Sequence, residues 1–265
     1  MTAQLSTHES HSLISISGLD HRKDILEAIA VYLVAAIAQC LDSNFQIRNA
    51  LFGETSFNRD IHNDVTKVIG VDNTISSDIK RDERNPWLWE GLSHLLINLS
   101  ISINEIHPPQ PIIMKTSIHL DVKDHGLDLI ALYGDDELGI STGECKAYLE
   151  SPGRAITDAA SRLSEVDSHS RDAEIRATIS QFRPSLSATD KAKLSGTFWH
   201  DEKTYLPMVC CDQGNATSFT RNRKSLRVLG PPIDKKLLIP VSIKDAKLFF
   251  DLLSDEMRLY ALKKV

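Results

Sequence analysis

Cysteines and long apolar runs are scarce in this chain, and each shortage excludes a class of protein. The four cysteines, at positions 40, 145, 210 and 211, have neither the spacing of a disulfide framework nor that of a zinc site. The apolar stretch 28–38 is too short to span a bilayer. The N-terminus lacks the basic start and apolar centre of a signal peptide. We therefore expect a cytoplasmic protein with no membrane partner.

Basic charge is also in short supply. The chain carries 30 Lys and Arg against 36 Asp and Glu, a formal net charge of −6, which argues against binding nucleic acid by overall charge. Residues 171–265 are the exception, with 17 basic and 11 acidic residues. Four of them form a basic cluster that is the best candidate for contacting DNA phosphates, and a solvated loop is the alternative. The basic cluster comprises Arg221, Arg223, Lys224 and Arg227.

An acidic β-hairpin pattern carries the chemistry of a divalent-metal site. Residues 125–146 read HGLDLIALYGDDELGISTGECK, with Asp128 on the first expected strand and Glu144 and Lys146 on the second. Mg²⁺ prefers carboxylate oxygens, completed by substrate phosphate and water, and a bound ion activates that water. Because side chains alternate along a strand, Lys146 points to the same face as Glu144. There it can orient the water or neutralise developing charge.

The length of the hairpin turn decides whether the two carboxylates meet. If residues 135–137 form a three-residue loop, Gly134 pairs with Leu138 and Asp128 lies directly opposite Glu144. A four-residue loop would place the carboxylates on opposite faces, since a slip of one residue reverses the pattern. The catalytic interpretation therefore requires the odd loop or a bulge.

A structural interpretation is available for the same residues. Asp128 could be a solvated acid at a strand end, and Glu144 and Lys146 an exposed cross-strand charge pair. Asp128 is embedded in an apolar run, however, where an unpaired carboxylate is costly. This setting favours the catalytic interpretation.

These motifs resemble the core of the PD-(D/E)xK nuclease superfamily, in which a Gly-x-Asp strand and a short turn precede a strand ending in Glu-x-Lys. The resemblance covers residues 85–212. Within it, the local sequence HGLDLI…GECKAYLESPGRAITDA is similar to that of the HamA nuclease subunits of Hachiman anti-phage systems. The resemblance implies that Asp128 and Glu144 bind Mg²⁺ or Mn²⁺ and that Lys146 is the catalytic lysine. It also implies that the backbone carbonyl of Cys145 is a candidate third ligand.

In that superfamily a helix supplying a further acid precedes the hairpin. Here Asn85 is expected to be the N-cap and Pro86 the first helical residue, and apolar residues recur at helical spacing up to residue 102. Glu90 lies close to the first turn, where it is either an outer metal ligand or an acid that complements the helix dipole. His94 is expected to be a core histidine rather than a ligand.

The whole pattern predicts an α/β fold with a restriction-endonuclease-like mixed sheet flanked by helices and an N-terminal helical extension. The extension, residues 1–84, is expected to hold an edge strand or poorly ordered segment before residue 18. A helix over 20–41 and a strand–loop pair over 45–57 are expected to follow. Residues 85–265 are expected to form the nuclease-like core. Its expected elements are strands over 111–120 and 205–211 and helices over 151–166, 171–182 and 242–263.

The expected function is that of a Mg²⁺-dependent DNA endonuclease, the effector of an anti-phage defence complex. The chain has no Walker loop, and the resemblance implies a superfamily-2 helicase, HamB-like, that forms a heterodimer with it and delivers DNA. The last helix, with Phe249, Phe250 and Met257 at helical spacing, is either core or a docking face for that partner. Two alternatives are a non-catalytic assembly subunit with the nuclease fold and a stand-alone restriction or junction-resolving nuclease.

Overall fold

The computed structural model describes six stretches of the chain. For residues 39–52, 55–60 and 263 it describes the backbone alone. The six stretches are residues 2–52, 55–100, 111–119, 126–134, 137–194 and 196–263.

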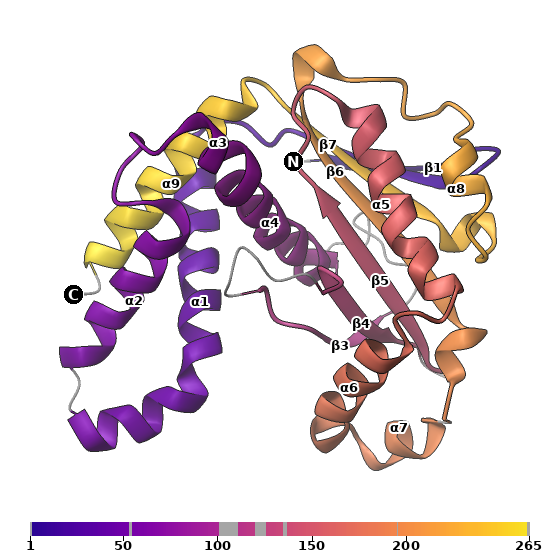
Figure 1. The fold of residues 1–265 in the computed structure, drawn as a ribbon, viewed down its shortest axis with the longest axis horizontal. Coiled ribbons are helices and arrows are strands. Elements are labelled where there is room, and N and C mark those ends of the chain that lie inside the picture. Colours follow the sequence, from indigo (N-terminus) through magenta and orange to yellow (C-terminus); the bar gives the residue numbers. More distant parts are fainter. Residues whose placement is uncertain are drawn as a thin grey trace.

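A seven-stranded mixed sheet with helices on both faces forms the centre of the fold, which confirms the expected α/β class (Figure 1). The spatial order is β1-β2-β7-β6-β5-β4-β3. The four central strands β2, β7, β6 and β5 are parallel to one another, whereas β1, β4 and β3 are added antiparallel. The strands are β1 (Thr2–Thr7), β2 (Ser12–Ser17), β3 (Ile112–Lys115), β4 (Leu129–Tyr133), β5 (Gly139–Lys146), β6 (Lys203–Asp212) and β7 (Leu237–Ile243).

Two layers of helices cover the sheet, one on each face. Side chains alternate between the faces of a strand, and in the central strands both sets are apolar and need covering. In β6, Leu206, Met208 and Cys210 pack with α1, α4 and α9, whereas Tyr205 and Val209 pack with α5 and α6. No helix in the described part of the chain is long and apolar enough to cross a membrane. The helices are α1 (Lys23–Phe52), α2 (Thr55–Ile69), α3 (Ser77–Ile79), α4 (Asn85–Ser100), α5 (Pro152–Asp167), α6 (Asp172–Phe182), α7 (Ala188–Lys193), α8 (Lys224–Arg227) and α9 (Ala246–Lys263).

Several core elements lie where the sequence predicts them. The helices expected over 151–166 and 171–182 are α5 and α6, and the strand expected over 205–211 is β6, which runs parallel to β5. The strand expected over 111–120 is β3, which is shorter than expected and spans Ile112–Lys115. The core elements that position the hairpin are therefore confirmed.

The first 84 residues are joined to the sheet rather than set apart from it. Strands β1 and β2 form a hairpin, and β2 pairs with β7, so the sheet does not break at the boundary expected at residue 84. The strand–loop pair expected over 45–57 is wrong, because α1 continues to residue 52 and α2 starts at 55. Gln46, Ala50 and Leu51 have high helix propensity, and α1 continues through Asn49, which lies between them.

The helix leading to the hairpin starts earlier than expected. Ser76 caps it, since its Oγ accepts a hydrogen bond from the N–H of Ile79 at 3.2 Å. α3 then continues through a π-helical turn, residues 80–84, directly into α4. The N-cap expected at Asn85 is therefore wrong. A wide turn suits Pro86, which has no N–H to donate and whose ring would clash with the carbonyl one α-turn earlier.

The C-terminal segment is a strand followed by a helix. The helix expected from residue 242 starts only at Ala246, after β7 and after Asp245, whose φ is 47°. Phe249, Phe250 and Met257 have no exposed surface and lie in the core shared with α1 and α4. Of the two interpretations of these three side chains, the core one is confirmed and the docking face is wrong, because the fold itself covers them.

Candidate active site

The hairpin register brings the two predicted carboxylates together. Leu129 pairs with Gly143 and Tyr133 with Gly139, which is the register of the odd loop, although residues 135 and 136 of the turn lie outside the described chain. Continued by one position, this register places Asp128 opposite Glu144. The N–H of the next residue, Cys145, donates a hydrogen bond of 2.6 Å to Asp128 Oδ2.

Lys146 and Glu144 lie on the same face, as the Glu-x-Lys spacing predicts. Lys146 Nζ donates a hydrogen bond of 2.6 Å to Glu144 Oε1. The Glu144 side chain is only 4% exposed and that of Lys146 is 24% exposed. The other carboxylate oxygen, Glu144 Oε2, is buried and has no hydrogen-bond partner among the described residues. A buried carboxylate oxygen without a donor is costly, and a cation would remove that cost.

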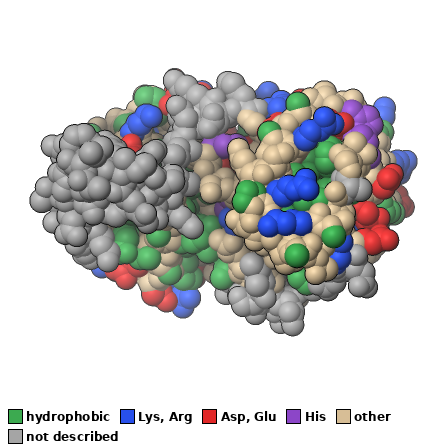
Figure 2. All heavy atoms as spheres, turned by 90° about the horizontal axis from the view of Figure 1, so that it is seen from below, with side chains coloured by type: hydrophobic (Ala, Val, Ile, Leu, Met, Phe, Trp, Pro, Cys, Tyr) green, Lys and Arg blue, Asp and Glu red, His purple; other side chains and the backbone are tan. Residues whose placement is uncertain are grey.

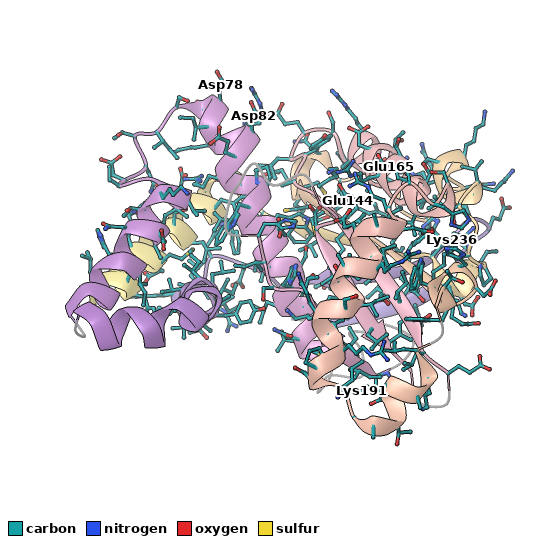
Figure 3. All side chains as sticks on the ribbon, turned by 60° about the horizontal axis from the view of Figure 1, so that its bottom comes forward. Asp78, Asp82, Glu144, Glu165, Lys191 and Lys236 are labelled. Carbon is teal, nitrogen blue, oxygen red and sulfur yellow. The ribbon has the colours of Figure 1, made fainter. Side chains whose placement is uncertain are left out.

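The three side chains line an open pocket of about 490 Å³ between the hairpin and α5. Figure 3 shows Glu144 and Glu165 of α5 in the same part of the molecule. The pocket has room for a solvated ion and a phosphate group. Its walls are Gly126, Asp128, Glu144, Lys146, Asp158, Ser161, Arg162 and Glu165.

The pocket concentrates negative charge that is poorly compensated without a cation. Burial raises the pKa of Asp128 to about 8, and the neighbouring carboxylates of Glu144 and Glu90 act in the same direction. Burial also raises the pKa of Glu144, against the opposing effect of Lys146. For Lys146, burial alone would lower the pKa, but Glu144 and Asp128 outweigh it and raise the pKa. Lys146 therefore stays cationic, whereas the raised pKa values of Asp128 and Glu144 favour their protonation as long as no cation is bound.

Glu90 reaches the site from α4, as the sequence suggested. It is buried and accepts a hydrogen bond of 3.0 Å from the N–H of His119, whose Nδ1 lies 3.1 Å from the same oxygen. Glu90, His119 and Asp128 each place a potential ligand atom within 4.8 Å of the other two. Glu90 therefore lies at the site rather than merely at a helix end. The sequence did not identify His119, because it belongs to no motif and joins the group only through the fold.

The backbone and the core histidine fix the position of Asp128. His94 Nε2 lies 2.8 Å from the carbonyl oxygen of Asp128, and burial, assisted by Lys115, lowers the pKa of His94 to about 3. His94 is therefore a neutral core histidine, as expected. The Cys145 side chain lies in the core on the opposite face, so only its backbone is available to the site. Its carbonyl as a metal ligand stays a prediction.

An ion-pair network on α5 and α6 forms the pocket wall facing the hairpin. Arg171 Nε lies 2.6 Å from Glu165 Oε2, and Arg162 Nη1 lies 3.0 Å from the same oxygen. Arg171 also pairs with Glu174 at 2.9 Å, and Glu174 accepts a hydrogen bond of 2.6 Å from the N–H of Leu127. The network ties the wall to the residue before Asp128. The sequence analysis did not identify this network, although the three-residue spacings of Arg162–Glu165 and Arg171–Glu174 are a helical signal.

The basic cluster is not part of the pocket. Arg223 is half-buried, donates to the carbonyl of Ser218 at 2.9 Å and lies near Gly153 in the first turn of α5. Arg227 is exposed and 3.8 Å from the exposed Glu9. The pocket instead borders α5 further along, from residue 158. Figure 2 shows Lys and Arg side chains on another view of the surface, interspersed with acidic and uncharged ones. DNA contact by the cluster stays a prediction.

The comparisons with known proteins assign no family to this chain. No protein-family model matches the sequence, and the search of curated proteins gave no match. The resemblance in the hairpin therefore rests on the motif residues themselves.

Proposed function

We propose that this chain is a metal-dependent nuclease that hydrolyses DNA phosphodiester bonds at the pocket of Asp128, Glu144 and Lys146. The observation that carries the proposal is the buried carboxylate pair with one oxygen, Glu144 Oε2, that has no donor among the described residues. A pair of carboxylates beside a lysine in an open pocket is the donor set for Mg²⁺ or Mn²⁺ and a phosphate.

The residues of the pocket fit such an ion. Asp128 and Glu144 would hold it, with Glu90 close enough to contribute, directly or through water. When bound, the ion supplies Lewis-acid stabilisation and lowers the pKa of a bound water. Lys146 is protonated and would orient the attacking water or stabilise charge developing on the phosphate.

Arg162 gives the pocket a second positive group for the substrate. It lines the pocket on the α5 side, with its side chain 26% exposed. A guanidinium can bind two phosphate oxygens at once, which a lysine cannot. We infer that Arg162 positions the scissile phosphate or its neighbour while the hairpin supplies the chemistry.

The finer proposal is a restriction-endonuclease-like core working with a helicase, as in Hachiman systems. Its support is the resemblance in the motif block and the acid-bearing helix α4 ahead of the hairpin. The chain is acidic and has no motor motif, so DNA delivery by a superfamily-2 helicase fits it. By itself the chain should bind DNA weakly, with an affinity that falls steeply with salt.

Digestion of supercoiled plasmid by the purified chain, with and without the candidate helicase, tests this function. We expect cleavage with Mg²⁺ or Mn²⁺ and none with chelator. Glu144→Gln and Lys146→Met should abolish cleavage, whereas Glu150→Gln, an exposed acid paired with exposed Lys247, is the matched control. Unchanged cleavage by Glu144→Gln would reject the assignment of catalysis to this pocket, and a metal-binding but inactive wild type with helicase present would favour the assembly subunit.

A further inference from the structure

A second cluster of metal-binding side chains lies outside the pocket. His169 lies in the turn between α5 and α6, Asp172 begins α6, and His200 ends the 3₁₀ turn Phe198–His200 before β6. Each places a potential ligand atom within 4.8 Å of the other two. Two segments of chain, the α5–α6 connection and the turn before β6, therefore converge on one point of the surface.

The two imidazoles share one carboxylate unequally. His200 Nε2 lies 2.8 Å from Asp172 Oδ2, which is a hydrogen bond. His169 Nδ1 lies 3.6 Å from Asp172 Oδ1, too far for one. The two ring centroids are nevertheless only 4.2 Å apart, with their planes tilted by 51°, so both imidazoles lie beside the same carboxylate.

The backbone and a neighbouring tryptophan hold the three groups in place. His169 has φ 61°, a conformation that residues other than glycine rarely adopt, and its N–H donates to the carbonyl of Val166 at 3.2 Å. Buried Trp199 donates from Nε1 to Asp172 Oδ1 at 3.2 Å. The hydrogen bond from Trp199 orients the Asp172 carboxylate, so that Oδ2 lies beside His200 Nε2, where both atoms could coordinate one ion.

The cluster is accessible from solvent. The His169, Asp172 and His200 side chains are 52%, 22% and 30% exposed, so an ion can enter from solvent and keep a water ligand.

We propose that His169, Asp172 and His200 bind a transition-metal ion of the Zn²⁺ class, at a site separate from the pocket. Imidazole nitrogens suit Zn²⁺, Co²⁺ or Ni²⁺ and suit Mg²⁺ poorly, so the two sites select different ions by ligand chemistry. Three protein ligands leave the fourth tetrahedral position to water.

The bound ion would join the α5–α6 turn to the segment that enters β6. The turn also carries Arg171, which pairs with Glu165 of the pocket wall at 2.6 Å. The ion would thus hold the α5–α6 turn, and with it Arg171, in place without contacting Asp128, Glu144 or Lys146. Metal binding at this site should raise the melting temperature of the chain, since the ion binds only the folded arrangement.

Titration of the metal-free full-length chain with Co²⁺, followed by Zn²⁺ displacement, tests the site. A tetrahedral Co²⁺ spectrum should appear at one equivalent and persist in excess Mg²⁺. His169→Asn, which tolerates the positive φ, and His200→Gln should each weaken Zn²⁺ affinity by at least about tenfold. His62→Gln, in α2, is the control outside the cluster, and Asp128→Asn removes ion binding at the pocket.

The variants separate this site from the pocket. Zn²⁺ binding retained in Asp128→Asn and lost in His200→Gln supports the proposal, whether or not the chain cleaves DNA. Binding lost in Asp128→Asn and kept in both histidine variants assigns the ion to the pocket and overturns it, as does a wild type that binds no Zn²⁺. Metal-free melting curves of the histidine variants, expected to match the wild type, show that lost binding is not lost folding.

Discussion

Two buried charge clusters in this protein differ in how their charges are balanced. Where the π-helical turn meets α9, Arg84 is 1% exposed and lies 2.6 Å from Asp251, which also pairs with Lys80 at 3.0 Å. Arg258 lies 2.6 Å from Asp255. In this arginine cluster each acid faces at least one cation.

The pocket has the opposite balance. Its lining holds four acids, Asp128, Glu144, Asp158 and Glu165, and two cations, Lys146 and Arg162, and Glu144 Oε2 has no donor in the described chain. Arg84 and Glu144 are both buried side chains, but acids outnumber cations only at the pocket. The excess of like charge, rather than burial alone, marks the pocket as the candidate functional cluster and the arginine cluster as a structural one.

The largest contrast should come from removing one charge from each cluster. Glu144→Gln should reduce plasmid cleavage by at least about 10³-fold, because it removes a metal ligand that acts in the transition state. Its free energy of unfolding without metal should stay equal or rise, because repulsion with Asp128 is relieved. Cleavage rates and urea unfolding of one protein preparation measure both. A strongly destabilised Glu144→Gln protein would make the pocket a structural cluster.

Arg84→Met should produce the reverse pattern. The substitution removes a buried guanidinium that pairs with Asp251 and donates hydrogen bonds to Asn85 and Asn73, so the free energy of unfolding should fall by about 3 kcal/mol. Cleavage by the protein that remains folded should be unchanged. Combining Arg84→Met with Asp251→Asn should recover part of the loss, and full additivity of the two single effects in urea unfolding would contradict the pairing.

A smaller contrast is expected in the pH dependence of stability. The pKa of Asp128 is raised to about 8 in the fold, against about 3.9 in the unfolded chain, so the folded state holds more protons between these values. The contribution of Asp128 to the stability of the metal-free protein should therefore fall as pH rises from about 4 to about 8. Asp128→Asn should flatten this decline, and Mg²⁺ should restore stability at pH 8. A wild type and variant with parallel urea midpoints across this range would contradict the shift.

The smallest effects are expected in the basic cluster. Arg221→Gln and Lys224→Gln should each weaken DNA binding only a few-fold and reduce the salt slope by about one, because each would lose a single phosphate contact. Lys191→Gln, on α7, is the control. Fluorescence anisotropy at several salt concentrations measures both quantities. An unchanged salt slope would make the cluster a solvated surface, as the alternative interpretation holds.

The sequence predicted the hairpin chemistry because the signals there are local. Alternation along β5 is enough to place Glu144 and Lys146 on one face, and apolar runs are enough to define both strands. It could not fix the register, which depends on the turn. It also misjudged Asn85 as a cap, since the π-helical turn that overrides it begins five residues earlier.

The sequence by itself determined the α/β class, the two strands of the hairpin and which residue types could hold an ion. Tertiary structure alone decided that His119 and Arg162 join the site and that Phe249 and Phe250 are core. It also brought His169 and His200 to one carboxylate. Periodicity is a property of neighbouring residues along a strand or helix. Contacts between distant segments depend instead on how helices and sheet pack, because only packing brings side chains from separate elements within bonding distance.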